Sequence, residues 1–454
     1  MTRALVRLVL PDVQDLLREG TADDVAAALA PFHSADVAEL IGELDEEQAA
    51  KLVLGLEAQK RTEVFELLEV PLAARLLERI GPKELAPTVA AMASDDRADL
   101  VAALPDALEA QVMAAMPAED REEALELAGY PEGTAGAIMT ADYVHLSPDE
   151  TARDAIEHIR QVARKRETIY ATYVVDQDER LLGAVSLETL ILAPPEKKLR
   201  EIMFPPIYGK VDDDQEAVVE KLRHYDFLAL PIVDEAGIMQ GIVTYDDAYD
   251  VAEEEATEDA HLMGGVSPLP APYFETSLPN IVRARALWLS ILFFTELFGG
   301  SILRQFEHTL ERVVALVFFL PLIIASGGNS GAQSATLVIR GLAVGDVEPK
   351  DVWRIVRREL ASGLTLGALL GLYGVGVATL WGLDDAPKIA VVVLVTLVAV
   401  VVGGSLLGSL MPLLMVRLKI DPAITSSPLV TCLVDVLGIL VYVLVAGAVF
   451  PPPT

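Results

Sequence analysis

The sequence predicts a multidomain protein: an all-α superhelical N-terminal domain, an α/β domain of two tandem repeats, a connecting helix, and an all-α membrane domain of five helices. Three observations lead to this prediction. Charged residues are dense before about residue 262 and sparse after 286. Residues 136–256 contain an internal repeat. Five long apolar segments follow, each of a length that spans a bilayer.

The composition is both acidic and apolar. The 454 residues include 35 Lys and Arg against 68 Asp and Glu, a net charge of −33, and 52% are hydrophobic. This contrast is resolved if a soluble acidic half precedes a membrane half. The negative charge argues against nucleic acid as a partner, because phosphates require a basic surface, and it favours cations. The single cysteine, Cys432, allows no intrachain disulfide.

Residues 1–130 are predicted to form a helical domain, because apolar residues recur at three- and four-residue spacing. Pro71, Pro82, Pro105 and Pro117 divide the region into short helices. The weak self-similarity of these helices predicts a superhelical stack, whose handedness the sequence does not set.

Two carboxylates of this domain stand out. Asp95 and Asp99 are one helical turn apart on one face, where like charges repel by a few tenths of a kcal/mol unless they share a cation. The alternative is a solvated acidic face, and both readings remain open at this point.

The internal repeat aligns the segment from Tyr173 with the segment from Pro231. Each copy, 136–199 and 200–256, reads as strand, helix, strand, turn, strand and helix. The pattern resembles a tandem pair of CBS domains, which can hold ATP through a Ser/Thr-x-x-Asp turn. The second copy carries that turn, and the first has Thr189 where the Asp belongs. The ATP-binding residues that the resemblance implies are Tyr170, Ser186, Phe227, Thr244 and Asp247.

Residues 257–280 are predicted to form a connecting helix and linker, and residues 281–454 the membrane domain. The predicted spans are Ala286–Leu303, Val313–Ile339, Leu360–Leu383, Ile389–Leu414 and Ile424–Phe450. Most basic residues flanking them fall on one side. We therefore expect a multi-pass protein of the cell membrane with a cytoplasmic N-terminal half and an outside C-terminus.

The last span contains one ionisable residue, Asp435. A carboxylate in mid-membrane costs about 3 kcal/mol on insertion scales, so Asp435 indicates either a cation path or a buried hydrogen-bonded Asp. Glu296 in the first span either reaches a wet crevice or is protonated. A polar, glycine-rich stretch, Pro321 to Thr336, lies in the second span. It is interpreted either as pore lining or as a helix-packing patch.

The segments SGGNSGAQSATLVIR, DPAITSSPLVTCLVDVLGIL and YDDAYDVAEEEATEDAHLMG, in this domain order, resemble the MgtE magnesium transporters. The resemblance implies a homodimeric Mg²⁺ channel with its pore between the subunits, formed near Asp435, Asn329 and Ser427. It also implies regulatory Mg²⁺ sites in the soluble half and at the membrane surface: Glu63, Asp95, Asp99, Asp214, Glu216, Asp226, Asp247, Asp250, Glu255, Glu258, Asp259 and Asp421.

The expected function is import of Mg²⁺ down the membrane potential, which supplies about 4.6 kcal/mol per 100 mV to a divalent ion. Cytosolic Mg²⁺ is expected to close the channel by bridging carboxylates. One alternative is a secondary divalent-metal transporter coupled to H⁺ or Na⁺, with Asp435 or Glu296 as the proton carrier. Another is a CBS sensor on a membrane anchor. An enzyme is not expected, because the sequence has no catalytic triad, phosphate loop or thiol-based metal motif.

Overall fold

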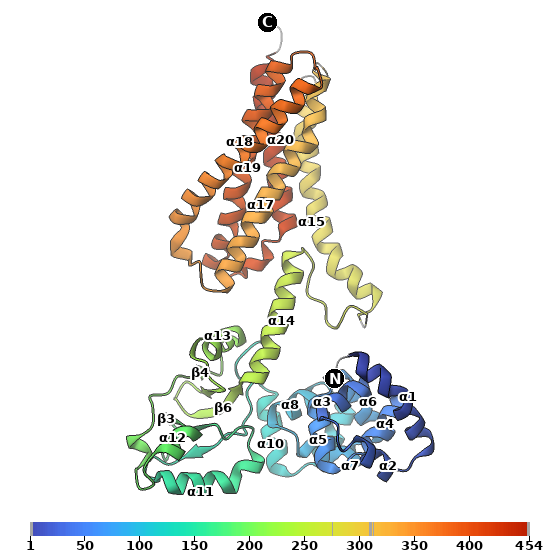
Figure 1. Cartoon of the computed structure of the whole chain (residues 1–454), viewed down its shortest axis with the longest axis vertical. Coiled ribbons are helices and arrows are strands. Elements are labelled where there is room, and N and C mark those ends of the chain that lie inside the picture. The colour runs from blue at the N-terminus through green and yellow to red at the C-terminus, as the bar shows by residue number, and fades with distance from the viewer. Residues whose placement is uncertain (1–2, 275, 308–310, 312, 452–454) are drawn as a thin grey trace. The chain divides into compact units, whose positions relative to one another are not determined.

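The computed structural model describes residues 3–274, 276–307, 311 and 313–451 (Figure 1). The chain forms two compact units, Met1–Glu253 and Glu254–Thr454. The first unit contains the helical domain and the α/β repeats. The second contains the end of the connecting helix and the apolar helices.

The N-terminal domain is all-helical, as predicted. Its helices are α1 Arg3–Glu19, α2 Ala22–Leu29, α3 Ser34–Gly42, α4 Glu46–Gly55, α5 Ala58–Glu66, α6 Val70–Ile80, α7 Pro82–Ala90, α8 Ser94–Ala102, α9 Asp106–Ala115 and α10 Ala118–Leu127. The four prolines noted in the sequence stand at helix starts: Pro71 and Pro82 in the first turns of α6 and α7, Pro105 and Pro117 at the N-caps of α9 and α10. The missing N–H of proline costs nothing at a helix start.

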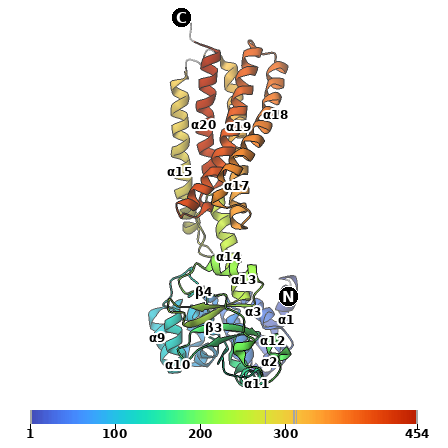
Figure 2. The same ribbon diagram turned by 90° about the vertical axis from the view of Figure 1, so that its left-hand side faces the viewer.

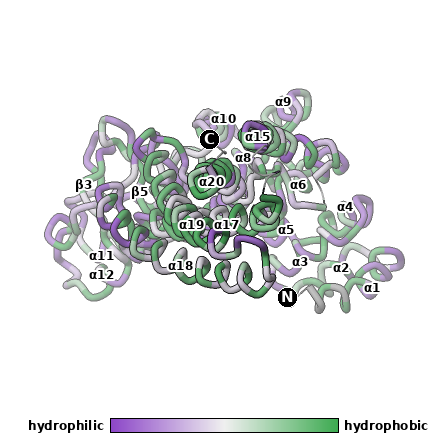
Figure 3. The backbone as a smooth tube through the Cα atoms, turned by 90° about the horizontal axis from the view of Figure 1, so that it is seen from above, coloured by the Kyte–Doolittle hydropathy of each residue, from purple (hydrophilic) through white to green (hydrophobic). Residues whose placement is uncertain are grey.

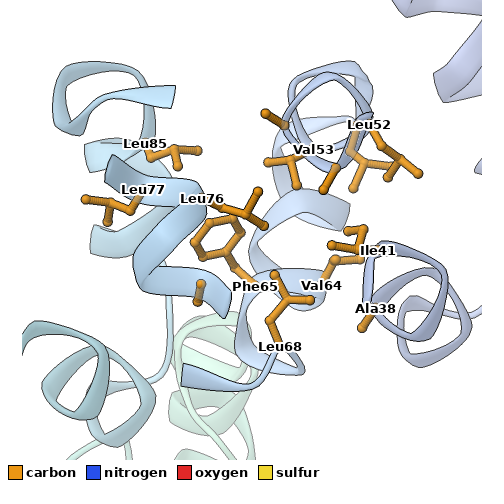
Figure 4. Packing of buried hydrophobic residues seen from close by; sticks show 14 of the residues in the cluster. Ala38, Ile41, Leu52, Val53, Val64, Phe65, Leu68, Leu76, Leu77 and Leu85 are labelled. Carbon is orange, nitrogen blue, oxygen red and sulfur yellow. The ribbon is translucent and has the colours of Figure 1, made fainter. Parts of the chain in front are cut away.

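The ten helices stack as a superhelix. Each helix packs against the second helix along the chain, from α1 on α3 through to α8 on α10. Leu76 of α6 and Phe65 of α5 face each other in the core, with Val53 of α4 close by (Figure 4). This stepwise packing is the arrangement expected of a repeat-like helical domain, and the superhelical prediction is confirmed.

The two repeats fold as predicted. The first contains β1 His145–Leu146, α11 Ala152–Val162, η1 Ala163–Lys165, β2 Ala171–Val175, β3 Leu181–Ser186 and α12 Leu187–Leu192. The second contains η2 Leu199–Glu201, β4 Gly209–Lys210, α13 Gln215–Tyr225, β5 Ala229–Val233, β6 Met239–Thr244 and the start of α14 Tyr245–Met263.

Each repeat has its own three-stranded sheet, in which the first strand is parallel and the third antiparallel to the middle strand. The sheets exchange partners. Thr140, near the start of the first repeat, bridges to Ile242 of β6, and Phe204, near the start of the second, bridges to Ala184 of β3. Residues 138–140 (Ile-Met-Thr) and 202–204 (Ile-Met-Phe) hold matching places in the two repeats, and each segment ties its own repeat to the other, as expected of a pair related by a pseudo-twofold.

The connecting helix is not a separate element. It is the continuation of α14, which follows β6 of the second repeat without a break and ends at Met263. Two glycines follow, and Gly265 has a positive φ of 68°. Residues 265–267 then contact the membrane helices within the second unit: Gly265 lies against Pro428 and Ser426, and Ser267 N donates to Ala284 O over 3.1 Å.

In the part of the chain that the structure describes, five helices are long and apolar enough to cross a membrane. They are α15 Leu278–Gln305, α17 Leu320–Ala343 preceded by η3 Val314–Phe319, α18 Val352–Leu380 preceded by η4 Pro349–Asp351, α19 Ala386–Arg417, and α20 Ser427–Val449 preceded by η5 Pro422–Ile424. The first and third begin eight residues earlier than predicted, because their polar first turns, with arginines at 283, 285, 354, 357 and 358, are helical too.

Helix α19 lies at the centre of this bundle, against α17, α18 and α20, while α15 contacts α20 (Figure 2). Seen from above, these helices are mainly hydrophobic along their length (Figure 3). Most of α15 is uncovered in the single chain, with 6% of its apolar window buried.

The glycine-rich stretch of the second span is a packing surface within a continuous helix. A Cβ at Gly327 would lie 2.2 Å from Val400, and one at Gly408 of α19 would lie 2.0 Å from Gly331 O. These contacts bring the backbones of α17 and α19 together, as small residues do between membrane helices. For the glycines, the helix-packing interpretation is confirmed.

Candidate cation sites

The first site lies where the N-terminal domain meets the second repeat. Ser94 at the start of α8 hydrogen-bonds Thr140 over 2.9 Å and accepts the N–H of Ala141 over 2.7 Å. Ala98 and Leu127 share a hydrophobic core with buried residues of the second repeat, among them Val218. The two domains are therefore joined by buried apolar and polar contacts at this junction.

Carboxylates gather around this contact. Asp95 and Asp96 lie on α8, Glu66 ends α5 and accepts the N–H of Ala93 over 2.9 Å, Glu167 comes from the first repeat, and Asp247 from α14. No Lys, Arg or His forms an ion pair with any of these five within the described part of the chain. Oδ1 of Asp95 is buried and accepts no hydrogen bond from described residues. We call these five residues the junction cluster.

The electrostatics of the junction cluster are those of crowded anions. Desolvation and the neighbouring carboxylates raise the pKa of Asp96 to about 8 and those of Glu167 and Asp247 to about 7. Desolvation raises the pKa of Asp95 to about 6, with a contribution from Asp99. Bound cations would replace the protons and relieve the same repulsion.

The junction cluster predicts a pH dependence. Because its folded pKa values lie above the unfolded ones, the folded state holds extra protons, and its stability falls as pH rises from about 4 to about 8. In EDTA we expect the unfolding temperature of the purified protein to be lower at pH 8.5 than at pH 6, and Mg²⁺ to restore it. In Asp96→Asn/Glu167→Gln the pH dependence should be weaker. An unfolding temperature that rises between pH 6 and 8.5 would contradict this account.

The structure distributes the other predicted regulatory residues over separate places. Glu63 accepts hydrogen bonds from Ser34 and Gln59 over 2.7 and 3.1 Å. Asp214 caps the start of α13 and Asp226 its end, so these two residues lie at opposite ends of one helix. Of the remaining residues, Asp99 is exposed on α8, Glu216 lies in the first turn of α13, and Asp250 is exposed on α14.

In the second unit, the end of α14 approaches the start of the last span. Desolvation raises the pKa of Asp259, and Asp421, Glu255 and Glu258 add to the shift, whereas Arg340 opposes it. This places a second set of carboxylates, Glu255, Glu258, Asp259 and Asp421, around one region of the membrane domain.

Sequence reasoning missed Glu66 and Glu167 of the junction cluster, and the nearby Asp142. Asp142 is half-buried beside Arg166, with Nη1 to Oδ1 at 3.4 Å. No local pattern marks these residues, since each is a single carboxylate in an ordinary helix end or loop. They join the cluster only through the contact between domains.

The candidate pore residue Asp435 is buried, with 8% of its surface exposed, between α20, α17 and α15. Its Oδ1 accepts no hydrogen bond from described residues, and a Cβ at Gly328 of α17 would lie 2.8 Å from that atom. The glycine thus lets α17 pass directly over the carboxyl. On its other side the carboxyl interacts with Glu296 of α15. A buried carboxyl oxygen without a partner is costly, which is the environment that a cation or its water relieves.

Asn329 and Ser427 do not hydrogen-bond this carboxyl. Asn329 is exposed on α17, and so are Gln333 and Thr336, at the spacing of one helical face. Ser427 is half-buried at the start of α20. The structure therefore brings Gly328 to Asp435 and leaves a polar stripe, Asn329, Gln333 and Thr336, on the outside of the single chain.

Direct chelation is not prearranged at these places. Among the described residues, no group of three or more His, Cys, Asp or Glu side chains is placed to hold a metal ion. Mg²⁺ keeps several waters when it binds proteins, so carboxylates that contact the ion through water do not need the short distances of a chelating site.

Comparison with known proteins identifies the family. Residues 320–445 match the divalent cation transporter domain of MgtE, residues 32–133 the MgtE intracellular N domain, and residues 135–196 and 199–254 the CBS domain. A magnesium transporter MgtE of Thermus thermophilus is 39% identical over 450 residues, which is 96% of this chain and 97% of that protein. The chain belongs to the MgtE family of magnesium transporters.

Other MgtE proteins extend the comparison. The MgtE of Bacillus subtilis is 32% identical over 434 residues, 95% of each chain. A crystal structure of the cytosolic domain of the Mg²⁺ channel MgtE in complex with ATP is 35% identical, with a TM-score of 0.51, and covers 53% of this chain and 99% of its own. The soluble MgtE half and the five apolar helices thus occur in the order that the sequence predicts.

The two repeats of this MgtE chain build equivalent turns at the positions implied for ATP. Leu187 N donates to Tyr170 O in the first repeat, and Tyr245 N donates to Leu228 O in the second, both over 3.0 Å. Ser186 Oγ contacts Thr189 over 2.8 Å, whereas the hydroxyl of Thr244 donates to Asp247. At the fourth position of the motif, the second turn therefore has the carboxylate of Asp247, and the first has the hydroxyl of Thr189.

Proposed function

We propose that this MgtE protein is a Mg²⁺-selective channel that imports Mg²⁺ down the membrane potential and is closed by cytosolic Mg²⁺. The observation that carries the proposal is the Asp435 carboxyl, buried in a membrane bundle with one oxygen that has no hydrogen-bond partner among the described residues. A carboxylate in that environment attracts a divalent cation strongly, and a hydrated ion would supply the missing partner.

The pore would lie between two subunits of a homodimer. The exposed polar stripe of α17 supports this arrangement, because Asn329 and Gln333 cannot satisfy their amide groups against lipid. A second copy facing this stripe would turn it into the lining of a wet path. Asn329 and Ser427 would then line the path on the way to Asp435 rather than bind the ion together with it.

Closure would follow from the carboxylates of the soluble half. The junction cluster contains carboxylates that form no ion pair with the described basic residues, and Mg²⁺ bound there would hold the N-terminal domain and the repeats together. Mg²⁺ among Glu255, Glu258, Asp259 and Asp421 would hold the end of α14 against the membrane domain. The remaining proposed regulatory ligands are Glu63, Asp99, Asp214, Glu216, Asp226 and Asp250.

In the proposed orientation, the N-terminal half is cytoplasmic and the C-terminus is outside. Arg283 and Arg285 begin the first span, and Arg417 ends the fourth; an even number of crossings separates them, so all three lie on the same side as the soluble half, and the fifth span takes the C-terminus to the other side. This side is also where a sensor of cytosolic Mg²⁺ must lie.

Uptake into liposomes separates the channel from a coupled transporter. With the purified protein, we expect Mg²⁺ uptake to follow an imposed K⁺ diffusion potential and to be unaffected by a pH gradient of either sign. Uptake that follows the pH gradient at zero potential would instead support the cation-coupled alternative, in which Asp435 or Glu296 carries a proton. Competition by Mn²⁺, Co²⁺ and Ca²⁺ in the same assay measures selectivity.

We also propose ATP as a ligand of the CBS pair, with Thr244 and Asp247 contacting its ribose and Tyr170, Ser186 and Phe227 forming the rest of the site. Asp247→Ala should weaken ATP binding about ten-fold or more, since a carboxylate held against a ribose contributes at least 1.4 kcal/mol. Thr189→Ala should change it little. Calorimetry with ATP on the purified protein measures both, and equal affinities for the parent and Asp247→Ala would contradict the assignment.

A further inference from the structure

Glu296 is a charged residue of the first span that the channel described above does not require. It is the nineteenth residue of α15, in a helix that is otherwise apolar at this depth. Although Glu296 is exposed in the single chain, its carboxyl group interacts with the side chains of Asp435 and Cys432 of α20. An acidic residue in the middle of a span raises the free energy of membrane insertion by about 3 kcal/mol, so a carboxylate without a function would be costly at this position.

The position of Glu296 follows from the contact between α15 and α20. Gly299, one turn further along α15, is buried against α20: a Cβ there would lie 3.2 Å from Ile439 Cδ1 and 3.5 Å from Val436 Cγ2. Oε2 of Glu296 lies 4.0 Å from the same point. The close approach at Gly299 therefore fixes the carboxyl of Glu296 at the helix interface, on the side of Asp435.

No cation balances this pair. In the described part of the chain, neither Glu296 nor Asp435 forms an ion pair with Lys, Arg or His. Asp435 is more than nine-tenths buried, and its Oδ1 has no hydrogen-bond partner. Two carboxyl groups from different helices thus meet in the membrane interior with an unpartnered oxygen beside them, which is a site for a positively charged ligand.

We propose that Glu296 is a second carboxylate of the pore cation site, supplied from α15 of the same subunit, and that it raises the affinity of that site for hydrated divalent cations. The proposal rests on the assignment of Asp435 to the pore. A homodimer would then present four carboxylates to the ion path instead of two. Because no three side chains are placed to chelate a metal in the described chain, Glu296 acts on the ion through its water shell.

The charge of Glu296 makes the pore cation site more selective for divalent over monovalent ions, because it raises the fraction of time that a divalent ion occupies the site. A divalent ion is attracted by each carboxylate twice as strongly as a monovalent one, so the second carboxylate favours Mg²⁺ over Na⁺ at the same place. In Mg²⁺-free solution the pore should conduct Na⁺, and low Mg²⁺ should block that current. The Mg²⁺ concentration for half-block measures the affinity of the site.

The test is made on the full-length protein in outside-out patches, with Mg²⁺-free solution on the soluble half and Mg²⁺ added on the other side. We expect Glu296→Gln to raise the half-blocking Mg²⁺ concentration about ten-fold, as loss of one of two nearby charges implies. Glu296→Asp keeps the charge on a shorter side chain and should lie between the parent and Glu296→Gln. The matched control Glu307→Gln, just beyond α15, should match the parent.

The outcomes separate this inference from the pore assignment. The role of Glu296 would be overturned if the half-blocking Mg²⁺ concentrations of Glu296→Gln and Glu296→Asp lay within about two-fold of the parent value. This holds even if Asp435→Asn abolishes the Mg²⁺ current. If Asp435→Asn conducts and is blocked like the parent, the pore assignment itself fails. Loss of all transport in folded Glu296→Gln, together with uptake that follows a pH gradient in the parent, would identify a proton carrier and also overturn the inference.

Discussion

Asp435→Ala is expected to lower the Mg²⁺ flux of this protein by about two orders of magnitude or more, because the mid-membrane carboxylate that attracts the ion is lost. The side chain is buried against Gly328 of α17, and its Oδ1 has no protein partner. Its removal takes away a charge rather than a packing contact of large area, so the bundle should remain folded. Mg²⁺ uptake into liposomes at a fixed potential measures the effect.

Two variants make this result interpretable. Asp435→Asn keeps the shape and removes the charge, and it should lose flux almost as completely as Asp435→Ala. Asp384→Ala removes an exposed carboxylate from the turn between α18 and α19 and should conduct normally. Near-normal uptake by a well-folded Asp435→Ala protein, judged by size-exclusion chromatography, would be incompatible with Asp435 as the pore residue.

Neutralising the carboxylates of the two regulatory places should leave the channel open at Mg²⁺ concentrations that close the parent. The structure separates these places, so each can be tested alone. Asp95→Asn/Asp99→Asn removes one charge of the junction cluster and one next to it on α8. Glu255→Gln/Glu258→Gln/Asp259→Asn removes it at the end of α14. Each should raise the closing Mg²⁺ concentration, and all five changes together should abolish closure, because several weak sites act in concert.

Protection of the 256–276 link from protease provides a second measurement. In the parent, millimolar Mg²⁺ should slow cleavage, and the effect should depend cooperatively on the Mg²⁺ concentration. In the variant that carries all five substitutions, Mg²⁺ should not change the rate of cleavage. A matched control is Glu119→Gln/Glu122→Gln/Glu126→Gln on α10, which removes three charges at exposed positions and should close like the parent. Cleavage that is independent of Mg²⁺ in the parent, or an unchanged midpoint in the five-fold variant, would show that the acidic half is only a solvated surface.

The features that sequence predicted well are those set by local chemistry. The length of apolar runs, the prolines at the starts of α6 and α7, and the repeated strand and turn signals depend on neighbours in the chain. The ends of the spans were predicted less well, since the arginines at the start of α18 are helical although they are not apolar.

The parts that could not be predicted depend on contacts between distant segments. Glu167 and Asp142 become significant only because α8 meets the second repeat, which no local pattern reveals. The same is true of Glu296, whose position beside Asp435 depends on the close approach at Gly299. The three glycines of the second span could be read as lining or as packing, and only their contacts with α19 and α20 decided between these readings.

The continuity of α14 has a mechanical consequence. Its 19 residues run from the end of β6 to Met263 as one rod, about 28 Å long at 1.5 Å per residue. The rod begins in one compact unit and ends in the other, since the boundary falls at Glu253. A tilt of its first turn by about 10° displaces the far end by about 5 Å, close to the rise of one helical turn. The helix is thus one continuous element shared by both units, and it ends at a glycine pair, of which Gly265 has a positive φ that turns the chain towards the first span.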